Sequence, residues 1–228
     1  RQMKRRIDSL ITKHGIKGYE KYVMELKNNK EIFDEFINFL TINVSEFYRN
    51  PEQWVTLEKD IFPMLFKKFG KNLKIWSAAC STGDEPYSLV MLLTKFLPLN
   101  QIKIMATDID KQVLEKARLG LYNVKSLKAL PKEFISKYFT QINDKTYQIS
   151  SDIKKRVELK DPYPTSCDLI ICRNVLIYFT EEAKTEIYKK FNSSLKKEGL
   201  LFVGSTEQII QPKVLGFNTY KSFFYEKF

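Results

Sequence analysis

The stretch LKIWSAACSTGDEPYSL, residues 73–89, decides the fold class. It begins as a short apolar run of the kind that forms a buried strand. The run passes into a turn of small residues, Ala78, Ala79, Ser81 and Gly83, which allow close backbone approach. An apolar stretch of helical character follows at once. The segment therefore predicts a strand, a turn and a helix in direct succession, which is the repeating unit of α/β proteins.

The same alternation continues along the chain. Further short apolar runs are separated by amphipathic stretches, which predicts a mostly parallel sheet with helices between its strands. Strands are expected at 73–79, 102–108, 168–174 and 200–206, and helices at 86–96, 111–119 and 181–197. The end of the chain, FNTYKSFFYEKF, has the aromatic richness of a closing strand or hairpin.

Residues 122–160 interrupt this alternation. A short helix is expected near 131–138, with two strands near 146–149 and 156–159. We interpret this segment as a small inserted β-subdomain.

The first fifty residues have a different texture. Their apolar residues recur at helical spacing, and Gly15 and Gly18 separate the first two runs. A further helix is expected to begin near Pro51, because proline suits the first helical turn. We therefore predict a helical N-terminal domain and linker over 1–50 and an α/β domain over 51–228. The apolar positions are Ile7, Leu10, Ile11, Tyr22, Val23, Leu26, Ile32, Phe33, Phe36, Ile37 and Leu40.

Composition limits where the protein acts and by what chemistry. Hydrophobic residues make up 43% of the chain, yet no apolar run approaches the roughly 20 residues that a membrane span needs. The basic opening segment is followed by Asp8, Lys13 and His14 and not by the apolar core of a secretory signal, so a cytoplasmic location is expected. His14 is the only histidine, which argues against histidine triads and multi-histidine metal sites.

The three cysteines, Cys80, Cys167 and Cys172, lack the spacing of zinc ligands, and their odd number argues against a disulfide framework. We expect buried, reduced thiols, no nucleophilic role for any of them, and no metal.

The net charge of +11 is unevenly distributed. Residues 1–30 carry an excess of six positive charges and residues 121–160 an excess of five, so the rest of the chain is neutral in sum. Solvated helix faces explain part of such an excess. Its clustering in two segments also indicates an acidic macromolecular partner, which could be a nucleic acid, a membrane surface or an acidic protein.

Chemically informative residues follow the predicted strands, where ligands bind in open α/β sheets. Asp108 ends the second strand 25 residues after Gly83, which suits it to accept hydrogen bonds from both ribose hydroxyls of an adenosine cofactor. The alternative is a helix N-cap, which Asp108 or Asp110 could supply. Asp84 and Glu85 put negative charge where a pyrophosphate would lie, which disfavours nicotinamide and flavin dinucleotides. S-adenosylmethionine carries a positive sulfonium and an amino group, and Glu85 is the candidate to face them.

Several motifs together resemble one family. WSAACSTGDEPYSL, ATDID, CRNVLIYF and LFVGSTE, preceded by NVSEFYRN, occur in the order found in the CheR-type chemotaxis receptor methyltransferases. The resemblance spans nearly the whole chain. It implies a Rossmann-like, S-adenosylmethionine-dependent methyltransferase sheet with a closing antiparallel strand, a small all-helical N-terminal domain and a small inserted β-subdomain. The implied reaction converts glutamate side chains of methyl-accepting chemotaxis receptors into methyl esters and leaves S-adenosylhomocysteine.

The resemblance also implies roles for individual residues. Arg49 and Tyr178 would be catalytic, with Tyr178 near the reacting methyl group; without the resemblance, Arg49 could be a surface cation and Tyr178 a core aromatic. The run 175–177 is expected to pack in the core. After Val157 this chain departs from the family's usual Asn-Leu pair, which leaves the adenine contacts there unassigned. The implied cofactor-binding residues are Asn43, Ser45 (where the family usually has threonine), Arg49, Glu85, Asp108, Arg173 and Asn174.

The implied partner is the acidic cytoplasmic helical bundle of the receptors, which would complement the basic segments 1–30 and 121–160. We expect a monomer that neither binds nucleic acid nor inserts into a membrane. The main alternative is a nucleic-acid methyltransferase, favoured by the sequence pI of about 9.4. The chain lacks an Asn/Asp-Pro-Pro-aromatic motif, a Pro-Cys nucleophile and an identifiable pocket for a flipped base. A non-catalytic binding module is a second alternative, which the intact candidate residues disfavour.

Overall fold

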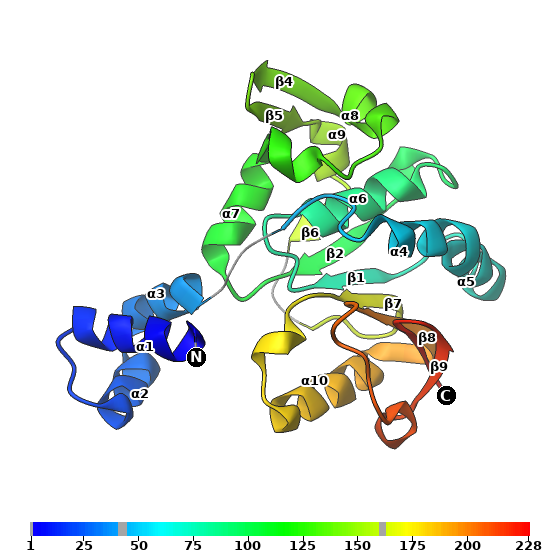
Figure 1. Cartoon of the computed structure of the whole chain (residues 1–228). Helices are drawn as coiled ribbons and strands as arrows, with labels where there is room; N and C mark the ends of the chain where they lie inside the picture. Colours follow the sequence, from blue (N-terminus) through cyan, green and yellow to red (C-terminus); the bar gives the residue numbers. More distant parts are fainter. Residues whose placement is uncertain (1, 41–44, 160–162) are drawn as a thin grey trace.

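A computed structural model describes residues 2–40, 45–159 and 163–228 of the chain. Its N-terminal part consists of the helices α1 (Gln2–Lys13), α2 (Tyr19–Asn28) and α3 (Lys30–Leu40), which cluster beside the rest of the molecule (Figure 1). Gly15 and Gly18 adopt positive φ angles between α1 and α2. Leu10 and Tyr22 are buried between the helices. The expected helical N-terminal domain is confirmed.

The large sheet has seven strands in the order β6-β2-β1-β7-β8-β10-β9. Its first five strands in this order run parallel to one another, and β10 pairs antiparallel with both β8 and β9. The expected mostly parallel sheet with a closing hairpin is therefore confirmed. The strands are β1 (Ile75–Ala78), β2 (Ile104–Thr107), β6 (Val157–Leu159), β7 (Cys167–Cys172), β8 (Leu195–Val203), β9 (Phe217–Lys221) and β10 (Phe224–Lys227).

Both faces of this sheet are covered, and successive residues of β7 belong to different cores. Leu169 and Ile171 belong to the core that includes α5 and α6, whereas Ile170 and Cys172 pack with Phe191 of α10. This explains why β7 is an unbroken apolar run. The elements around the sheet are α4 (Pro51–Thr56), the π-helix η1 (Leu57–Ile61), α5 (Phe62–Phe69), α6 (Asp84–Leu93), η2 (Leu99–Gln101), α7 (Lys111–Leu119), η4 (Leu176–Tyr178), α10 (Glu181–Ser194) and η5 (Pro212–Leu215).

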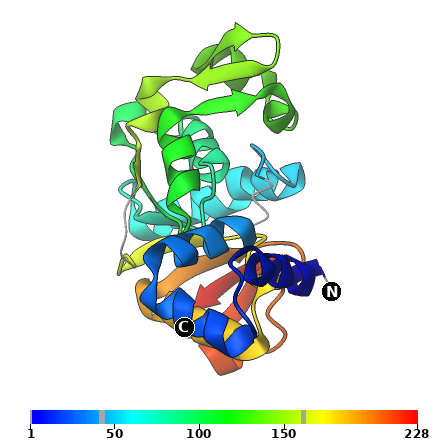
Figure 2. The same ribbon diagram turned by 90° about the vertical axis from the view of Figure 1, so that its left-hand side faces the viewer.

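A second, three-stranded antiparallel sheet has the order β3-β5-β4 and lies at one end of the molecule (Figures 1 and 2). The helix and the first strand predicted there are present, but β3 and β4 were not predicted. The segment comprises β3 (Leu121–Asn123), η3 (Val124–Leu127), α8 (Lys132–Tyr138), β4 (Phe139–Asn143), β5 (Thr146–Ile149) and α9 (Ser151–Lys154).

Several predicted bounds differ from the observed ones: the helix expected at 86–96 is α6, and the strand expected at 200–206 is β8 and begins at Leu195. Two differences have a clear physical reason. The strand expected at 156–159 forms as β6, but it pairs in parallel with β2 of the large sheet and not with the small sheet. Its position is set by the distant residue Ile104, which is the register partner of Val157. The helix expected to reach 197 ends at Ser194, because Leu195 already pairs with Cys167 as the first residue of β8. Among the described residues no helix is long and apolar enough to cross a membrane.

Candidate active site

The carboxyl ends of β1, β2, β7 and β8 meet at one edge of the large sheet, as they must when parallel strands are adjacent. The turn after β1 is strongly bent. Ala79 and Ser81 adopt positive φ angles that non-glycine residues rarely take, and Gly83 does the same. A side chain at Gly83 would meet the ring of Tyr87 at 2.7 Å, so only glycine fits there. Such strained turns concentrate at functional sites.

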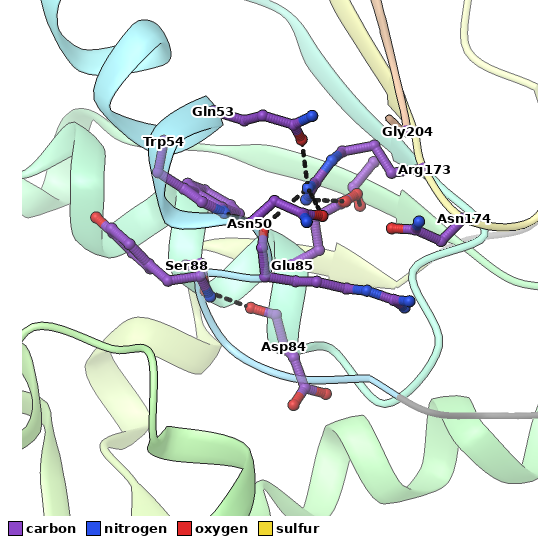
Figure 3. A network of polar contacts seen from close by, with 12 residues as sticks. Asn50, Gln53, Trp54, Asp84, Glu85, Ser88, Arg173, Asn174 and Gly204 are labelled. Atoms are coloured by element: carbon purple, nitrogen blue, oxygen red, sulfur yellow. Dashed lines mark hydrogen bonds and ion pairs between the residues drawn. The ribbon is translucent and has the colours of Figure 1, made fainter. Parts of the chain in front are cut away.

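Arg173, directly after β7, holds this edge to the start of α4 (Figure 3). Its Nη2 donates to the carbonyl of Arg49 at 2.7 Å, to Oε1 of Gln53 at 2.6 Å and to Oδ1 of Asn50 at 3.1 Å. Its Nη1 lies 3.5 Å from Oε2 of Glu85, and its side chain is only 2% exposed. A single guanidinium therefore joins the linker, the sheet and the first turn of α6.

Glu85 is the buried anionic partner of Arg173. Its Oε1 also accepts a hydrogen bond from the hydroxyl of Ser77 at 2.8 Å. Burial raises the pKa of the Glu85 carboxyl, while Arg173 and Ser77 oppose that rise because they stabilise the charged form. Burial likewise lowers the pKa of Arg173, and Glu85 opposes that change. Each charge compensates the desolvation of the other.

Asp108 and Asp110 have separate tasks. Asp110 caps α7, since its Oδ1 accepts hydrogen bonds from the backbone N–H groups of Gln112 and Val113. Asp108 instead bridges the turns, because its Oδ2 accepts from the N–H of Ser81 at 2.7 Å and its Oδ1 from the N–H of Asp110 at 2.9 Å. The structure therefore gives the role of helix cap to Asp110. Burial raises the pKa of Asp108.

Ser45 belongs to a contact between the linker and α6. Its hydroxyl hydrogen-bonds with the carboxylate of Asp84, whose pKa is raised by burial. Three residues later the N–H of Tyr48 donates to Oγ of Ser88 at 3.2 Å, and Ser88 donates to the Asp84 carbonyl at 2.6 Å. The linker thus follows the first turn of α6. Asn43, the other candidate in this segment, lies outside the described residues.

Arg49 is not an exposed surface cation. Its residue is half-buried, and its carbonyl accepts from Nε1 of Trp54 at 3.0 Å as well as from Arg173. Its neighbours Tyr48 and Asn50 both adopt positive φ angles. The charge of Arg49 lowers the pKa of Arg173, which places the two side chains near one another.

Tyr178 and Asn174 lie on the connection after β7. Tyr178 is 45% exposed on η4, so the alternative of a core aromatic is wrong. The expectation that 175–177 packs in the core holds for Leu176 but not for Ile177, which is 47% exposed. Asn174 adopts φ 61 and directs the chain away from β7. The structure therefore unites Arg49, Glu85, Arg173 and Asn174 closely, with Tyr178 on the adjoining turn.

Glu207 is a residue of this edge to which the sequence reasoning assigned no role. Its carboxylate accepts hydrogen bonds from the backbone N–H groups of Asn174, Leu176 and Gly204, and the residue is 5% exposed. It ends the motif LFVGSTE that carried part of the resemblance. Its position three residues after Gly204 at the end of a predicted strand was the available signal, but a glutamate there could equally face water.

The expected buried thiols are confirmed. All three cysteines are free and buried, and burial is the main cause that raises the pKa of each thiol. The carboxylates of Asp108 and Glu85 raise the pKa of Cys80 further, and those of Glu207, Glu85 and Asp108 raise the pKa of Cys172. A raised pKa disfavours the thiolate, so none of the three thiols is activated as a nucleophile.

Comparison with known protein families identifies the family of this chain. Residues 1–41 match the all-alpha domain of CheR methyltransferases, and residues 43–222 match the SAM binding domain of CheR methyltransferases. The chain belongs to the CheR methyltransferase family. The resemblance read from the motifs is confirmed, and so is S-adenosylmethionine as the cofactor.

Relatives from distant bacteria agree. The chain is 41% identical to the chemotaxis protein methyltransferase of Listeria monocytogenes over 99% of its own length and 88% of that protein. It is 35% identical to the chemotaxis protein methyltransferase of Borreliella burgdorferi over 90% of this chain and 78% of the relative. It is also 35% identical to the chemotaxis protein methyltransferase of Escherichia coli over 89% of this chain and 73% of the relative.

The residues at the strand ends fit this cofactor. Glu85 and Asp108 provide the negative charge that suits a sulfonium and an amino group. Nε of Arg173 is buried and has no hydrogen-bond partner among the described residues, which leaves a donor for a carboxylate such as the one S-adenosylmethionine carries. The combination of acidic groups and one unsatisfied cationic donor matches the mixed charges of an amino-acid cofactor.

Proposed function

We propose that this chain transfers the methyl group of S-adenosylmethionine to glutamate side chains of chemotaxis receptors, giving methyl esters and S-adenosylhomocysteine. The observation that carries the proposal is the pairing of two kinds of charge at one sheet edge. Buried carboxylates follow β1 and β2, and two arginines, Arg49 and Arg173, lie beside them. The first group suits a cationic cofactor and the second suits an anionic acceptor.

The cofactor half of the site lies over β1 and β2. When bound, S-adenosylmethionine supplies an electrophilic methyl group on a positively charged sulfur. Asp108 accepts hydrogen bonds from the backbone N–H groups of Ser81, Asp110 and Ile109, and its two carboxylate oxygens offer about four acceptor positions, which leaves capacity for a ribose hydroxyl. We assign Glu85 to the amino or sulfonium end, and Ser45, Arg49, Arg173 and Asn174 to further cofactor contacts, with Asn43 proposed from the family resemblance alone.

The acceptor half is supported by a cavity on the β8 side. This cavity has a volume of about 450 Å³ and is lined by Asn50, Gln53 and Ser205, among others. Asn50 and Gln53 also hold Arg173, so the cavity adjoins the arginines. The strand order places β7 and β8 on the other side of β1 from β2. An acceptor entering here would come from the side of the sheet opposite to Asp108, the candidate partner of the ribose.

The chemistry requires no general base. A glutamate carboxylate, with a reference pKa of about 4.3, is already ionised at neutral pH. The single histidine, His14, lies in the turn after α1, where its Nε2 is 2.7 Å from Oε2 of Glu35. Rate enhancement then comes from holding the carboxylate in line with the methyl group, which can lower a barrier by up to roughly 7–11 kcal/mol. We assign this positioning to Arg49 and Tyr178.

The proposed receptor partner is supported by the charge distribution of this chain. The basic segments 1–30 and 121–160 complement the acidic helical bundle of a receptor's cytoplasmic part, so transfer rates should fall as salt is added. We propose that the helical domain and linker, 1–50, face the receptor, that 51–228 form the catalytic domain with the inserted subdomain near 122–160, and that the protein acts as a cytoplasmic monomer.

The test is transfer of radiolabelled methyl groups from S-adenosylmethionine to membranes that contain chemotaxis receptors, at several salt concentrations. Base-labile label on receptor protein that decreases with salt is the expected result. Base-stable label on added RNA or DNA, with none on protein, would refute the acceptor and favour a nucleic-acid methyltransferase. The variant Arg49→Ala should bind S-adenosylhomocysteine more weakly and should turn over slowly even when S-adenosylmethionine is saturating. Full turnover by this variant at saturation would remove Arg49 from the positioning of the acceptor.

A further inference from the structure

We propose that Glu207 is a positioning residue for methyl transfer: its carboxylate fixes the connection after β7 in the shape that cofactor and acceptor require. The proposal rests on the proposed function only for the identity of the acceptor. Glu207 lies beyond the end of β8 and belongs to none of the groups assigned above to the cofactor or the acceptor.

Three hydrogen bonds define the arrangement. Oε2 of Glu207 accepts from the N–H of Asn174 at 2.6 Å and from the N–H of Gly204 at 2.9 Å, and Oε1 accepts from the N–H of Leu176 at 2.6 Å. The Glu207 carbonyl in turn accepts from the hydroxyl of Tyr188 at 3.3 Å. One buried side chain thus joins the ends of two adjacent parallel strands, β7 and β8.

The connection after β7 turns through a left-handed residue, a conformation that is uncommon outside glycine although asparagine tolerates it. Asn174 adopts φ 61, and left-handed residues persist where their surroundings over-determine them. The space is also tight. A Cβ atom at Gly204 would lie 2.4 Å from Oε2 of Glu207 and 2.9 Å from the Asn174 nitrogen, so the two backbones approach as closely as only glycine allows.

The braced connection carries the candidate residues themselves. Arg173 immediately precedes Asn174, and Tyr178 ends the η4 turn that Leu176 begins. The negative charge of Glu207 also favours the charged form of Arg173, whose pKa it raises. A loss of this carboxylate would therefore displace three proposed site residues together, without removing any group that contacts the cofactor or the acceptor.

The experiment compares Glu207→Gln with a matched control, Asp168→Asn. Asp168 is a fully buried carboxylate near the opposite end of β7, where Oδ2 accepts from the N–H of Lys74 at 2.7 Å and Oδ1 pairs with Nζ of Lys196 at 2.7 Å. Both amides replace one acceptor oxygen by a donor, so both variants should melt at a lower temperature than the wild type. Only Glu207→Gln should disturb the site.

The measurements are the affinity for S-adenosylhomocysteine by calorimetry, and kcat and KM for S-adenosylmethionine in the receptor assay. Because small misplacements can cost on the order of a hundredfold in rate, we expect Glu207→Gln to lose at least about tenfold in affinity and in kcat. Asp168→Asn should stay within about twofold of the wild type in both. The calorimetric titration needs no acceptor protein, so it tests Glu207 even if the receptor assignment fails.

A conservative variant covers the case in which Glu207→Gln does not fold. Glu207→Asp keeps both carboxylate oxygens but withdraws them by one methylene, and we expect affinity and kcat between those of the wild type and those of a site without the brace. Wild-type affinity and kcat in whichever of these variants folds would overturn the proposal. An equal loss in Asp168→Asn would also overturn it, because the effect would then follow stability and not position.

Discussion

Replacing Asp108 by asparagine should separate cofactor recognition from helix capping, because the chain offers Asp110→Asn as a neighbouring control. The two residues are close in sequence and both are acidic. Asp110 supplies two hydrogen bonds to the first turn of α7, whereas Asp108 holds the N–H groups of Ser81 and of Asp110 itself. Only Asp108→Asn should weaken the affinity for an adenosine cofactor.

The size of the effect follows from the hydrogen bonds. In Asp108→Asn one of the two oxygens becomes an NH₂ group, which must face the N–H of Ser81 or of Asp110. Leaving one of these N–H groups without an acceptor costs about 1–3 kcal/mol of unfolding free energy, or roughly 2–12 °C in melting temperature for a chain of this size. Loss of a charge-assisted bond to one ribose hydroxyl costs about 1.5–3 kcal/mol, a roughly 10–100-fold weaker affinity for S-adenosylhomocysteine.

The control should behave differently. Asparagine caps helices about as well as aspartate, so Asp110→Asn should keep the cap and lose a favourable charge at the start of α7, which is worth less than about 1 kcal/mol. Its affinity for S-adenosylhomocysteine should stay within about threefold of the wild type. Calorimetric titration and thermal melting of the three proteins provide the test. The reasoning is refuted if Asp108→Asn binds like the wild type, or if Asp110→Asn loses as much affinity.

Three further outcomes follow from the same geometry. Burial raises the pKa of Glu85 and Asp108 in the cofactor-free protein, and a bound cofactor favours their charged forms, so affinity for S-adenosylhomocysteine should fall as the pH is lowered from neutral toward about 5. Because their pKa values are raised in the folded state, Glu85 and Asp108 take up protons at a higher pH in the folded chain than in the unfolded chain, so their protonation favours the folded protein on mild acidification. Calorimetry beside thermal melting therefore distinguishes lost affinity from unfolding. An affinity that does not change with pH would contradict the assignment. Ser205→Trp should fill the cavity on the β8 side and reduce receptor methylation at least about tenfold, while S-adenosylhomocysteine binds as in the wild type. Val214→Trp, at a position 78% exposed and outside the cavity lining, should leave receptor methylation unchanged. Iodoacetamide should leave the native protein active and unlabelled at its buried thiols, and mass spectrometry that finds native Cys80 alkylated would show that this strand end opens.

The elements that could be predicted are those with local signals at both ends. The helix α7 has the predicted bounds, Lys111–Leu119, because Asp110 caps its start and Gly120 takes a left-handed conformation at its end. The strand β4 was missed because most of its residues are exposed, so it shows no alternation of apolar and polar positions. The short run of β6 was recognised, but its partner was not, since its pairing with β2 depends on residues about fifty positions away.

In the candidate site, too, some residues could be predicted from local signals and others depend on distant contacts. This difference determines which variants are informative. Acidic residues that follow parallel strands must converge, so Glu85 and Asp108 could be found from spacing. The partners of Arg173 could not, because Asn50 and Gln53 reach it only once α4 has packed on the sheet. Arg173 uses Nη2 and Nη1 to hold the protein together and has only Nε left for a ligand. Its removal would leave Glu85 buried without a counter-charge, at a cost of about 3–5 kcal/mol, and would therefore unfold the site before it reported on recognition. Asp108 and Glu207 avoid this ambiguity, because each has another buried carboxylate as its control: Asp110 on the same turn for Asp108, and Asp168 near the opposite end of β7 for Glu207.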